Sequence, residues 1–267
     1  MEAAISLLDR SPVLRRTINR IFYQYLAFLD KQGEVHLMNY GYADGSPLMR
    51  LESADEPDRL CLQLYHRVAS ATDLHGKDVL EVGSGRGGGA SYVHRYLGPK
   101  RTTGVDYAQR SVVFCQRTHR VPGLVFHHGD AEDLPFGASQ FDAVLNVESS
   151  HCYGSMARFL DEVVRVLKPG GHFLWADFRP AGEVAALLET VTDSGLAIKE
   201  QETITDNILA ALDGLSARNR ALIDRAVPRP LRPLFYRFAA VDGTTLRDRF
   251  TSGELTYLRI AAVTPAG

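Results

Sequence analysis

Short apolar runs alternate with longer segments of helical spacing through the middle of the chain. Each apolar run ends in a polar or glycine-rich turn, which is typical of buried strands separated by amphipathic helices. We expect strands at residues 78–82, 101–105, 124–127, 141–147, 172–176 and 197–203, and helices from the turn after the first strand to about Leu97 and at 108–118, 155–167 and 182–194. Repeated strand–helix units predict an α/β fold with a mainly parallel sheet and helices on both faces.

The two ends of the chain have a different pattern. Residues 13–30 and 55–72 have the spacing of amphipathic helices, and residues 255–263 alternate as a final strand. Residues 204–253 are mostly helical, with a proline-rich break at VPRPLRP, and predict either a lid over a substrate or a pair of packing helices. We expect one domain, 1–267. Its N-terminal helical cover spans 1–54, its core 55–203, its helical insertion 204–253 and its final strand 254–267.

The composition is ordinary for a globular protein, at 267 residues, 45% hydrophobic and 23% charged. A net charge of −2 gives no basic field, so nucleic acid is not an expected partner. Cys61, Cys115 and Cys152 are far apart and odd in number, which favours a reducing compartment over a disulfide framework. We find no secretory leader and no apolar run near 18 residues, and expect a cytoplasmic protein without stable membrane insertion. A homodimer is compatible with the sequence.

The glycine-rich turn in VLEVGSGRGGG, residues 79–89, indicates a bound cofactor. Three of its glycines satisfy the dinucleotide pattern G-x-G-x-x-G, while Glu81 followed by Gly83, Gly85 and Gly87 satisfies acid-x-G-x-G-x-G. A carboxylate would repel a pyrophosphate but attract the ammonium and sulfonium of S-adenosylmethionine. Glu81 therefore favours S-adenosylmethionine. A nicotinamide oxidoreductase and a glycine turn without a ligand are the alternatives.

Acidic residues after the next two strands support an adenosyl ligand. Parallel strands present their carboxyl ends at one edge of a sheet, where ligands bind. There Asp106 can accept from both ribose hydroxyls, although a helix N-cap would explain it too. Asp130 can accept from the adenine amino group, with the Ala131 backbone at a ring nitrogen. The complete set of expected cofactor-binding residues is Glu81, Gly83, Ser84, Gly85, Gly87, Asp106, Tyr107, Asp130, Ala131, Glu132, Asn146 and Tyr40.

Several motifs together resemble class I S-adenosylmethionine-dependent small-molecule methyltransferases: VLEVGSGRGGG, GVDYAQ, GDAEDLPF, FDAVLNVESSHCY, RVLKPGG and WADF. Over most of the chain, NYGY, LYHR, GGGASYV, NVESSHCY and GELTY are similar to the phthiotriolone and phenolphthiotriolone dimycocerosates methyltransferase family. The resemblance implies a Rossmann-like fold with a seven-stranded, mainly parallel sheet and an antiparallel final strand. It also implies O-methylation of a hydroxyl on a lipophilic polyketide or lipid.

An alkyl alcohol is a weak nucleophile, so its proton must pass to a base as the methyl group moves. His151 follows the fourth strand, and Asp177, expected at the end of the fifth, can orient its imidazole. Activity should then rise with pH through a pKa near that of histidine. The run ESSH…WADF resembles the rebeccamycin sugar O-methyltransferase family, whose matching His and Asp act near the acceptor hydroxyl. That family has a second histidine where this chain has Cys152. A hydrogen-bonded loop histidine and a turn aspartate are the structural alternatives.

Aromatic residues outside the core complete the set of candidates. Tyr40 can stabilise a sulfonium by cation–π attraction, or pack the N-terminal helix on the core. The expected acceptor-binding residues are Tyr42, Glu148, Cys152, Phe235 and Tyr236. No metal is expected, because the histidines form no ligand cluster by spacing. Methylation of carbon, nitrogen or the carboxyl group of a natural product or fatty acid, and a cyclase that binds S-adenosylmethionine without transferring its methyl group, are the functional alternatives.

Overall fold

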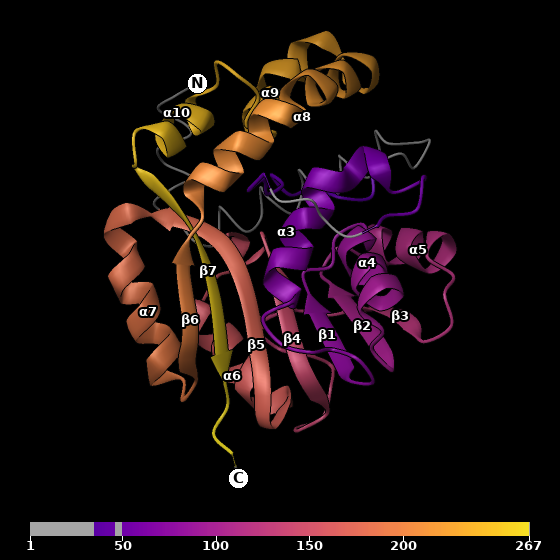
Figure 1. The fold of residues 1–267 in the computed structure, drawn as a ribbon, viewed down its shortest axis with the longest axis vertical. Coiled ribbons are helices and arrows are strands. Elements are labelled where there is room, and N and C mark those ends of the chain that lie inside the picture. The colour runs from indigo at the N-terminus through magenta and orange to yellow at the C-terminus, as the bar shows by residue number, and fades with distance from the viewer. Residues whose placement is uncertain (1–34, 46–49, 267) are drawn as a thin grey trace.

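The computed structural model describes residues 35–45 and 50–266, which form a seven-stranded sheet covered by helices on both faces (Figure 1). The helix expected at 13–30 lies outside the described residues. The strands are β1 (Asp78–Val82), β2 (Arg101–Asp106), β3 (Leu124–His128), β4 (Phe141–Val147), β5 (Leu167–Pro180), β6 (Ala197–Thr203) and β7 (Leu255–Val263). The α/β fold and the expected strands are confirmed.

The order of the strands is β3-β2-β1-β4-β5-β7-β6. Neighbours from β3 to β5 pair in parallel, while β7 lies antiparallel between β5 and β6. This is the mainly parallel sheet with an antiparallel final strand of the Rossmann-like methyltransferase fold. The order reverses between β1 and β4, which is where open α/β sheets bind their ligands.

Helices enclose the sheet because adjacent strand residues face opposite sides. In β5, Leu174 and Ala176 belong to one hydrophobic cluster, with residues of the helices α3 and α4, and Phe173 and Trp175 belong to another, with residues of α6 and α7. The helices before and between the strands are α3 (Arg59–Ala69), α4 (Gly88–Leu97), α5 (Gln109–Thr118), α6 (Met156–Val166) and α7 (Val184–Asp193). The first of these continues a short 3₁₀ turn, η1 (Glu56–Asp58).

Strand β5 is longer than the expected 172–176. It pairs with β7 from His172 opposite Val263 to Pro180 opposite Leu255, so the ladder continues beyond Asp177. Asp177 therefore lies inside the strand rather than at its end. The sequence signal was misleading because the partner that extends β5 comes about eighty residues later in the chain.

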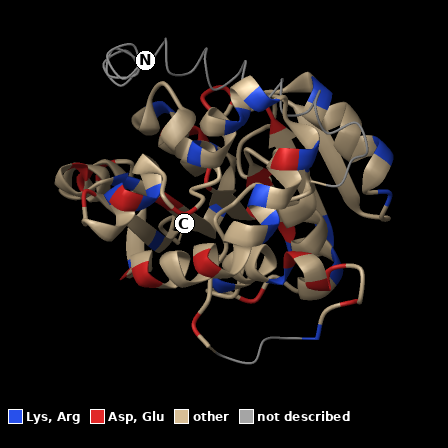
Figure 2. Cartoon of the chain, turned by 90° about the horizontal axis from the view of Figure 1, so that it is seen from above, with Lys and Arg blue, Asp and Glu red and all other residues tan. Residues whose placement is uncertain are grey.

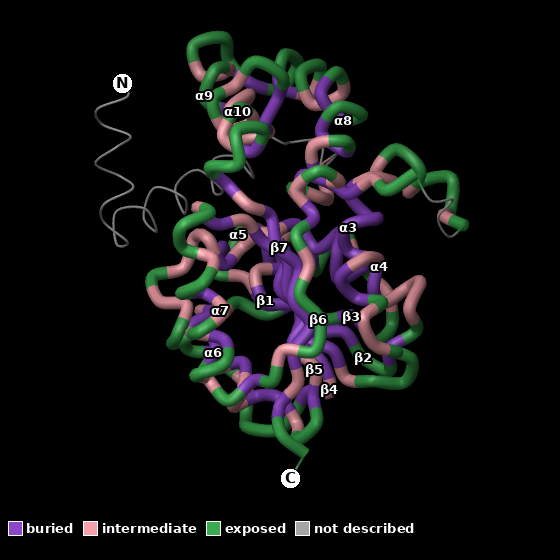
Figure 3. Tube along the Cα trace, turned by 60° about the vertical axis from the view of Figure 1, so that its left-hand side comes forward, coloured by how far each residue is buried: buried purple, intermediate pink, exposed green. Residues whose placement is uncertain are grey.

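The segment 204–253 is helical and lies above one end of the sheet, where its outer parts are exposed (Figures 1 and 3). It contains α8 (Thr205–Ala226), η4 (Arg229–Leu231), α9 (Arg232–Phe238) and α10 (Thr245–Thr251). Ile208 and Leu212 of α8 join the cluster formed by β4, β5 and α3. Figure 2 shows acidic and basic residues interspersed over the molecule seen from above. None of the helices in the described ranges is long and apolar enough to span a membrane.

Candidate functional site

A cavity opens at the carboxyl ends of β1, β2 and β4, beside the point where the strand order reverses. The residues that line it come from the segment 36–39, the glycine turn, the ends of the strands and the loops after β3 and β4. Among the expected cofactor-binding residues, those that line it are Gly83, Ser84, Gly85, Asp106, Tyr107, Asp130, Ala131 and Glu132. Glu148 and Cys152, expected at the acceptor, line it as well.

The glycine turn has the shape that the motif predicts. Gly83 has φ +75°, and a Cβ there would lie 2.3 Å from the Ser149 Oγ, so no larger residue fits. The Gly85 N–H donates to the Asp106 Oδ2 at 2.8 Å, and the Ala108 N–H donates to the Oδ1 at 2.8 Å. Burial raises the pKa of the Asp106 carboxyl, although these two backbone donors oppose the rise. Asp106 thus fixes the turn and faces the cavity.

Glu81 and Asn146 lie behind the cavity lining. Tyr65 lines the cavity, and its hydroxyl donates to the Glu81 Oε1 at 2.7 Å. Burial raises the pKa of the Glu81 carboxyl to about 8, and a cation in the cavity would favour its charged form. The Asn146 amide donates to the Val82 carbonyl at 2.9 Å and to the Ser149 hydroxyl at 2.8 Å, which ties the loop after β4 to the end of β1. Gly87 caps α4 outside the lining.

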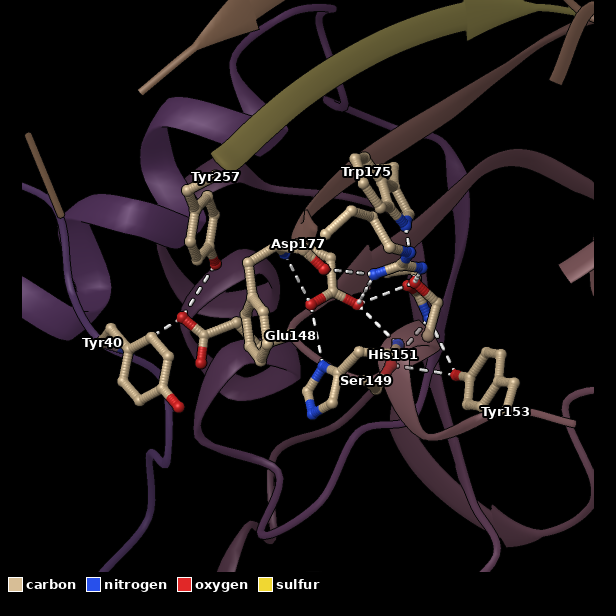
Figure 4. Close-up of polar contacts among 12 residues, drawn as sticks. Tyr40, Glu148, Ser149, His151, Tyr153, Trp175, Asp177 and Tyr257 are labelled. Atoms are coloured by element: carbon tan, nitrogen blue, oxygen red, sulfur yellow. Dashed lines mark hydrogen bonds and ion pairs between the residues drawn. The ribbon is translucent and has the colours of Figure 1, made fainter. Parts of the chain in front are cut away.

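His151 and Asp177 form a close pair beside this cavity without lining it (Figure 4). The His151 Nδ1 lies 2.8 Å from the Asp177 Oδ1, and Nε2 points away from the carboxylate. The imidazole side chain is 22% exposed, whereas the Asp177 side chain is 0% exposed. Burial lowers the pKa of His151, but the Asp177 carboxylate and Cys152 together raise it, so the pKa stands well above its ordinary value.

A hydrogen-bond network holds the Asp177 carboxylate in place. Its Oδ2 accepts from the Ser150 hydroxyl at 2.7 Å and from the His151 N–H at 2.8 Å. The same Ser150 oxygen accepts from the Trp175 indole N–H at 2.9 Å and from the Arg179 guanidinium at 2.8 Å. Burial alone would raise the pKa of Asp177, but His151 and Arg179 hold it well below its ordinary value. The carboxylate is therefore charged and rigid.

An aromatic cluster borders the same pair. The His151 ring stacks on Phe178 at 4.5 Å between centroids, and Phe178 contacts Tyr40 at 5.9 Å, Phe250 of α10 at 5.5 Å and Tyr257 of β7 at 6.3 Å. We call Tyr40, Phe178, Phe250 and Tyr257 the aromatic cluster. Tyr40 does not line the cavity, because its ring packs in this cluster against Phe178 and Phe250.

Three expected acceptor residues are not brought to the cavity. Tyr42 is buried, and its N–H donates to the Leu60 carbonyl at 2.9 Å. Phe235 packs in a small cluster with residues of α8, and the Tyr236 hydroxyl donates to the Asp224 Oδ1 at 2.6 Å. The inward face of α9 thus packs on α8. Phe250, which the sequence reasoning did not single out, is the aromatic residue of the segment 204–253 that reaches the aromatic cluster.

The residues around the cavity fit S-adenosylmethionine. The acidic side chains expected at the cofactor line it, namely Asp106, Asp130 and Glu132, and Glu148, expected at the acceptor, lines it as well. The Ser84 Oγ is buried and has no hydrogen-bond partner among the described residues, as expected where a ligand supplies one. A ligand with cationic groups, ribose hydroxyls and no phosphate suits this set, whereas a pyrophosphate would be repelled.

Proteins that are similar to this chain are named as methyltransferases. A methyltransferase-domain family model matches residues 80–175. The chain is 46% identical over 225 residues to the phthiotriol/phenolphthiotriol dimycocerosates methyltransferase of Mycobacterium tuberculosis, covering 84% of this chain and 83% of that enzyme. It is 40% identical over 220 residues to the fatty-acid O-methyltransferase of Mycolicibacterium smegmatis, covering 82% and 80%. Among solved structures, the cyclase SpnF has a TM-score of 0.70 at 22% identity over 94% of this chain and 96% of that one, which shows the fold alone.

Proposed function

Because the chain belongs to the family of the phthiotriol/phenolphthiotriol dimycocerosates methyltransferases, we propose that it methylates a hydroxyl oxygen of a lipophilic molecule. It is an S-adenosylmethionine-dependent methyltransferase. The names of its relatives support a lipophilic acceptor, and the name of the fatty-acid enzyme supports oxygen as the methylated atom. Phe178, the partly exposed member of the aromatic cluster, offers an apolar contact for such an acceptor, and Phe250 packs against it.

The His151–Asp177 pair is the observation that carries the proposal. S-adenosylmethionine supplies an electrophilic methyl group on a sulfonium. The His151 imidazole takes the proton of the acceptor hydroxyl at Nε2 as the oxygen attacks, and the buried Asp177 carboxylate stabilises the imidazolium that forms. Because Asp177 holds Nδ1, the basic lone pair is directed away from the carboxylate.

The pH dependence follows from this arrangement. The pKa of His151 stands well above its ordinary value, so the imidazolium dominates in the free protein at neutral pH. Activity should rise with pH through a pKa higher than the ordinary value of about 6.5, rather than near it. Cationic charge bound in the neighbouring cavity would lower this pKa and free the base.

Carboxyl methylation is the second candidate, because one relative is a fatty-acid O-methyltransferase. A carboxylate needs no base, and an imidazolium at position 151 would bind it directly. The two candidates differ in their response to removal of the imidazole.

The test is a screen of hydroxylated lipids, polyketides and fatty acids for a mass gain of about 14 Da, followed by His151→Ala. For an alcohol acceptor we expect kcat to fall about 10²–10⁴-fold with an unchanged Kd for S-adenosylmethionine. The exposed His75→Ala is the matched control and should be silent. An alanine variant that methylates its alcohol at the wild-type rate would refute the base. Product without S-adenosylhomocysteine would instead identify a cyclase.

A further inference from the structure

Glu148 is held in an unusual backbone conformation at the edge of the cavity. It follows β4 directly, lines the cavity and has φ +47°, one of the few positive values among the non-glycine residues described. Its N–H donates to the Ala176 carbonyl at 2.9 Å, which fixes this conformation against β5. A strained non-glycine residue that faces a binding cavity is often placed there for function.

One oxygen of the Glu148 carboxylate is saturated and the other is not. The Oε1 accepts from the Tyr40 N–H at 2.8 Å and from the Tyr257 hydroxyl at 2.8 Å, so segments from both ends of the chain hold it (Figure 4). No described residue donates to the Oε2. This oxygen has an anchored position and free lone pairs beside the cavity.

The surroundings of Glu148 are apolar on the side of the aromatic cluster. Tyr40 and Tyr257, which hold the carboxylate, belong to the cluster on which His151 stacks through Phe178. Glu148 and His151 therefore border one region. A lipophilic acceptor that binds there would remove water from the Oε2. Leaving this buried oxygen without a hydrogen-bond donor would weaken binding by roughly 1–3 kcal/mol. An acceptor with a single hydroxyl, placed at His151, would leave that loss uncompensated.

We propose that Glu148 binds a second hydroxyl of the acceptor, so that the enzyme selects lipophilic diols or polyols over single alcohols. This inference rests on the proposed O-methylation of a hydroxyl. His151 receives the hydroxyl that is methylated, and the Glu148 Oε2 accepts a hydrogen bond from a neighbouring one. Burial raises the pKa of Glu148 to about 8, and in either protonation state an oxygen remains that can accept this bond.

The test compares a long-chain monoalcohol with vicinal and 1,3-diols of the same chain length, in the wild type, Glu148→Ala and Glu148→Gln. We expect the wild type to favour a diol about 10–100-fold in kcat/KM. Glu148→Ala should raise KM for that diol until the preference is lost, with little change for the monoalcohol and for the Kd of S-adenosylmethionine. The exposed Glu183→Ala is the matched control.

Each other outcome has one meaning. A wild type that methylates no alcohol overturns the proposed function. A wild type that methylates monoalcohol and diols equally overturns only the role of Glu148. An alanine variant that loses the same factor on both acceptors, or that binds S-adenosylmethionine more weakly, also overturns it. If Glu148→Ala does not fold, the isosteric Glu148→Gln decides, since it should reduce the diol preference in part and leave the monoalcohol unchanged.

Discussion

Replacement of Asp106 should weaken cofactor binding and loosen the glycine turn, and the two effects can be measured separately. The carboxylate accepts from the Gly85 and Ala108 N–H groups and faces the cavity, where we expect two ribose hydroxyls to donate to it. Asp106→Ala removes both ligand bonds, a loss on the order of 3 kcal/mol, which corresponds to roughly a 100-fold higher Kd for S-adenosylmethionine. Asp106→Asn keeps one acceptor oxygen and should raise the Kd about tenfold.

Stability should change as well. Asp106→Ala leaves two backbone donors without their partner, and each costs about 1–3 kcal/mol where water does not replace it. Calorimetric titration with S-adenosylmethionine gives the Kd, and urea unfolding of the free protein gives the free energy of unfolding. Asp133→Ala removes the same charge from an exposed position of a nearby loop and serves as the control.

The pH dependence provides a sharper check. Because burial raises the pKa of Asp106 in the folded protein, the folded state holds this proton more readily than the unfolded state. The contribution of Asp106 to the free energy of unfolding therefore increases as pH falls through that window. Cofactor affinity should change in the opposite direction, because a protonated carboxyl is a poorer acceptor. A folded Asp106→Ala protein with wild-type affinity would refute this placement of the cofactor.

Further predictions concern the turn, the acceptor side and the base. Gly83→Ala should lower the urea midpoint and abolish detectable cofactor binding, since its Cβ would lie 2.3 Å from the Ser149 Oγ; normal binding would show that the turn relaxes. Phe250→Ala should raise acceptor KM several-fold with an unchanged Kd for S-adenosylmethionine, and an unchanged KM would remove α10 from the acceptor site. Hydrogen exchange in 204–253 should slow on acceptor binding; unchanged exchange there would place the acceptor elsewhere. Asp177→Asn should move the rising limb of the pH–rate profile to lower pH, because the carboxylate that raises the pKa of His151 is lost; a limb that stays in place would assign it to another group.

The site residues at the ends of the parallel strands were the ones that the sequence predicted best. Gly83, Gly85 and Asp106 meet at the cavity because each lies in a motif at the carboxyl end of a parallel strand. The geometry of the sheet brings these strand ends together. The His151–Asp177 contact could be expected because β4 and β5 are neighbours, and Asp177 follows the last pair of their ladder although β5 itself continues.

Side-chain direction outside the strands could not be predicted in this way. Tyr40 faces the aromatic cluster because it packs against Phe178 and Phe250, which lie more than a hundred residues away in the chain, and no local periodicity reveals such contacts. In the segment 204–253 every helix has apolar positions, so the pattern could not show that Phe235 packs inward on α8 while Phe250 reaches the aromatic cluster. Tyr65 and Tyr257 lay within the noted motifs LYHR and GELTY, but only their contacts with Glu81 and Glu148 give them a role.

The way in which the helical segment joins the sheet bears on how such enzymes diversify. β6 ends at Thr203, and this residue pairs with Leu258 of β7, so the chain leaves the sheet and returns to it at adjacent positions. An inserted segment whose two ends are fixed side by side can become longer or shorter with little loss of conformational entropy, about 0.6 kcal/mol for each doubling of its length. We therefore expect relatives to differ in this segment and in their acceptors together, while the strand ends where we place the methyl donor stay unaltered. Grafting it between relatives should transfer acceptor preference as a unit.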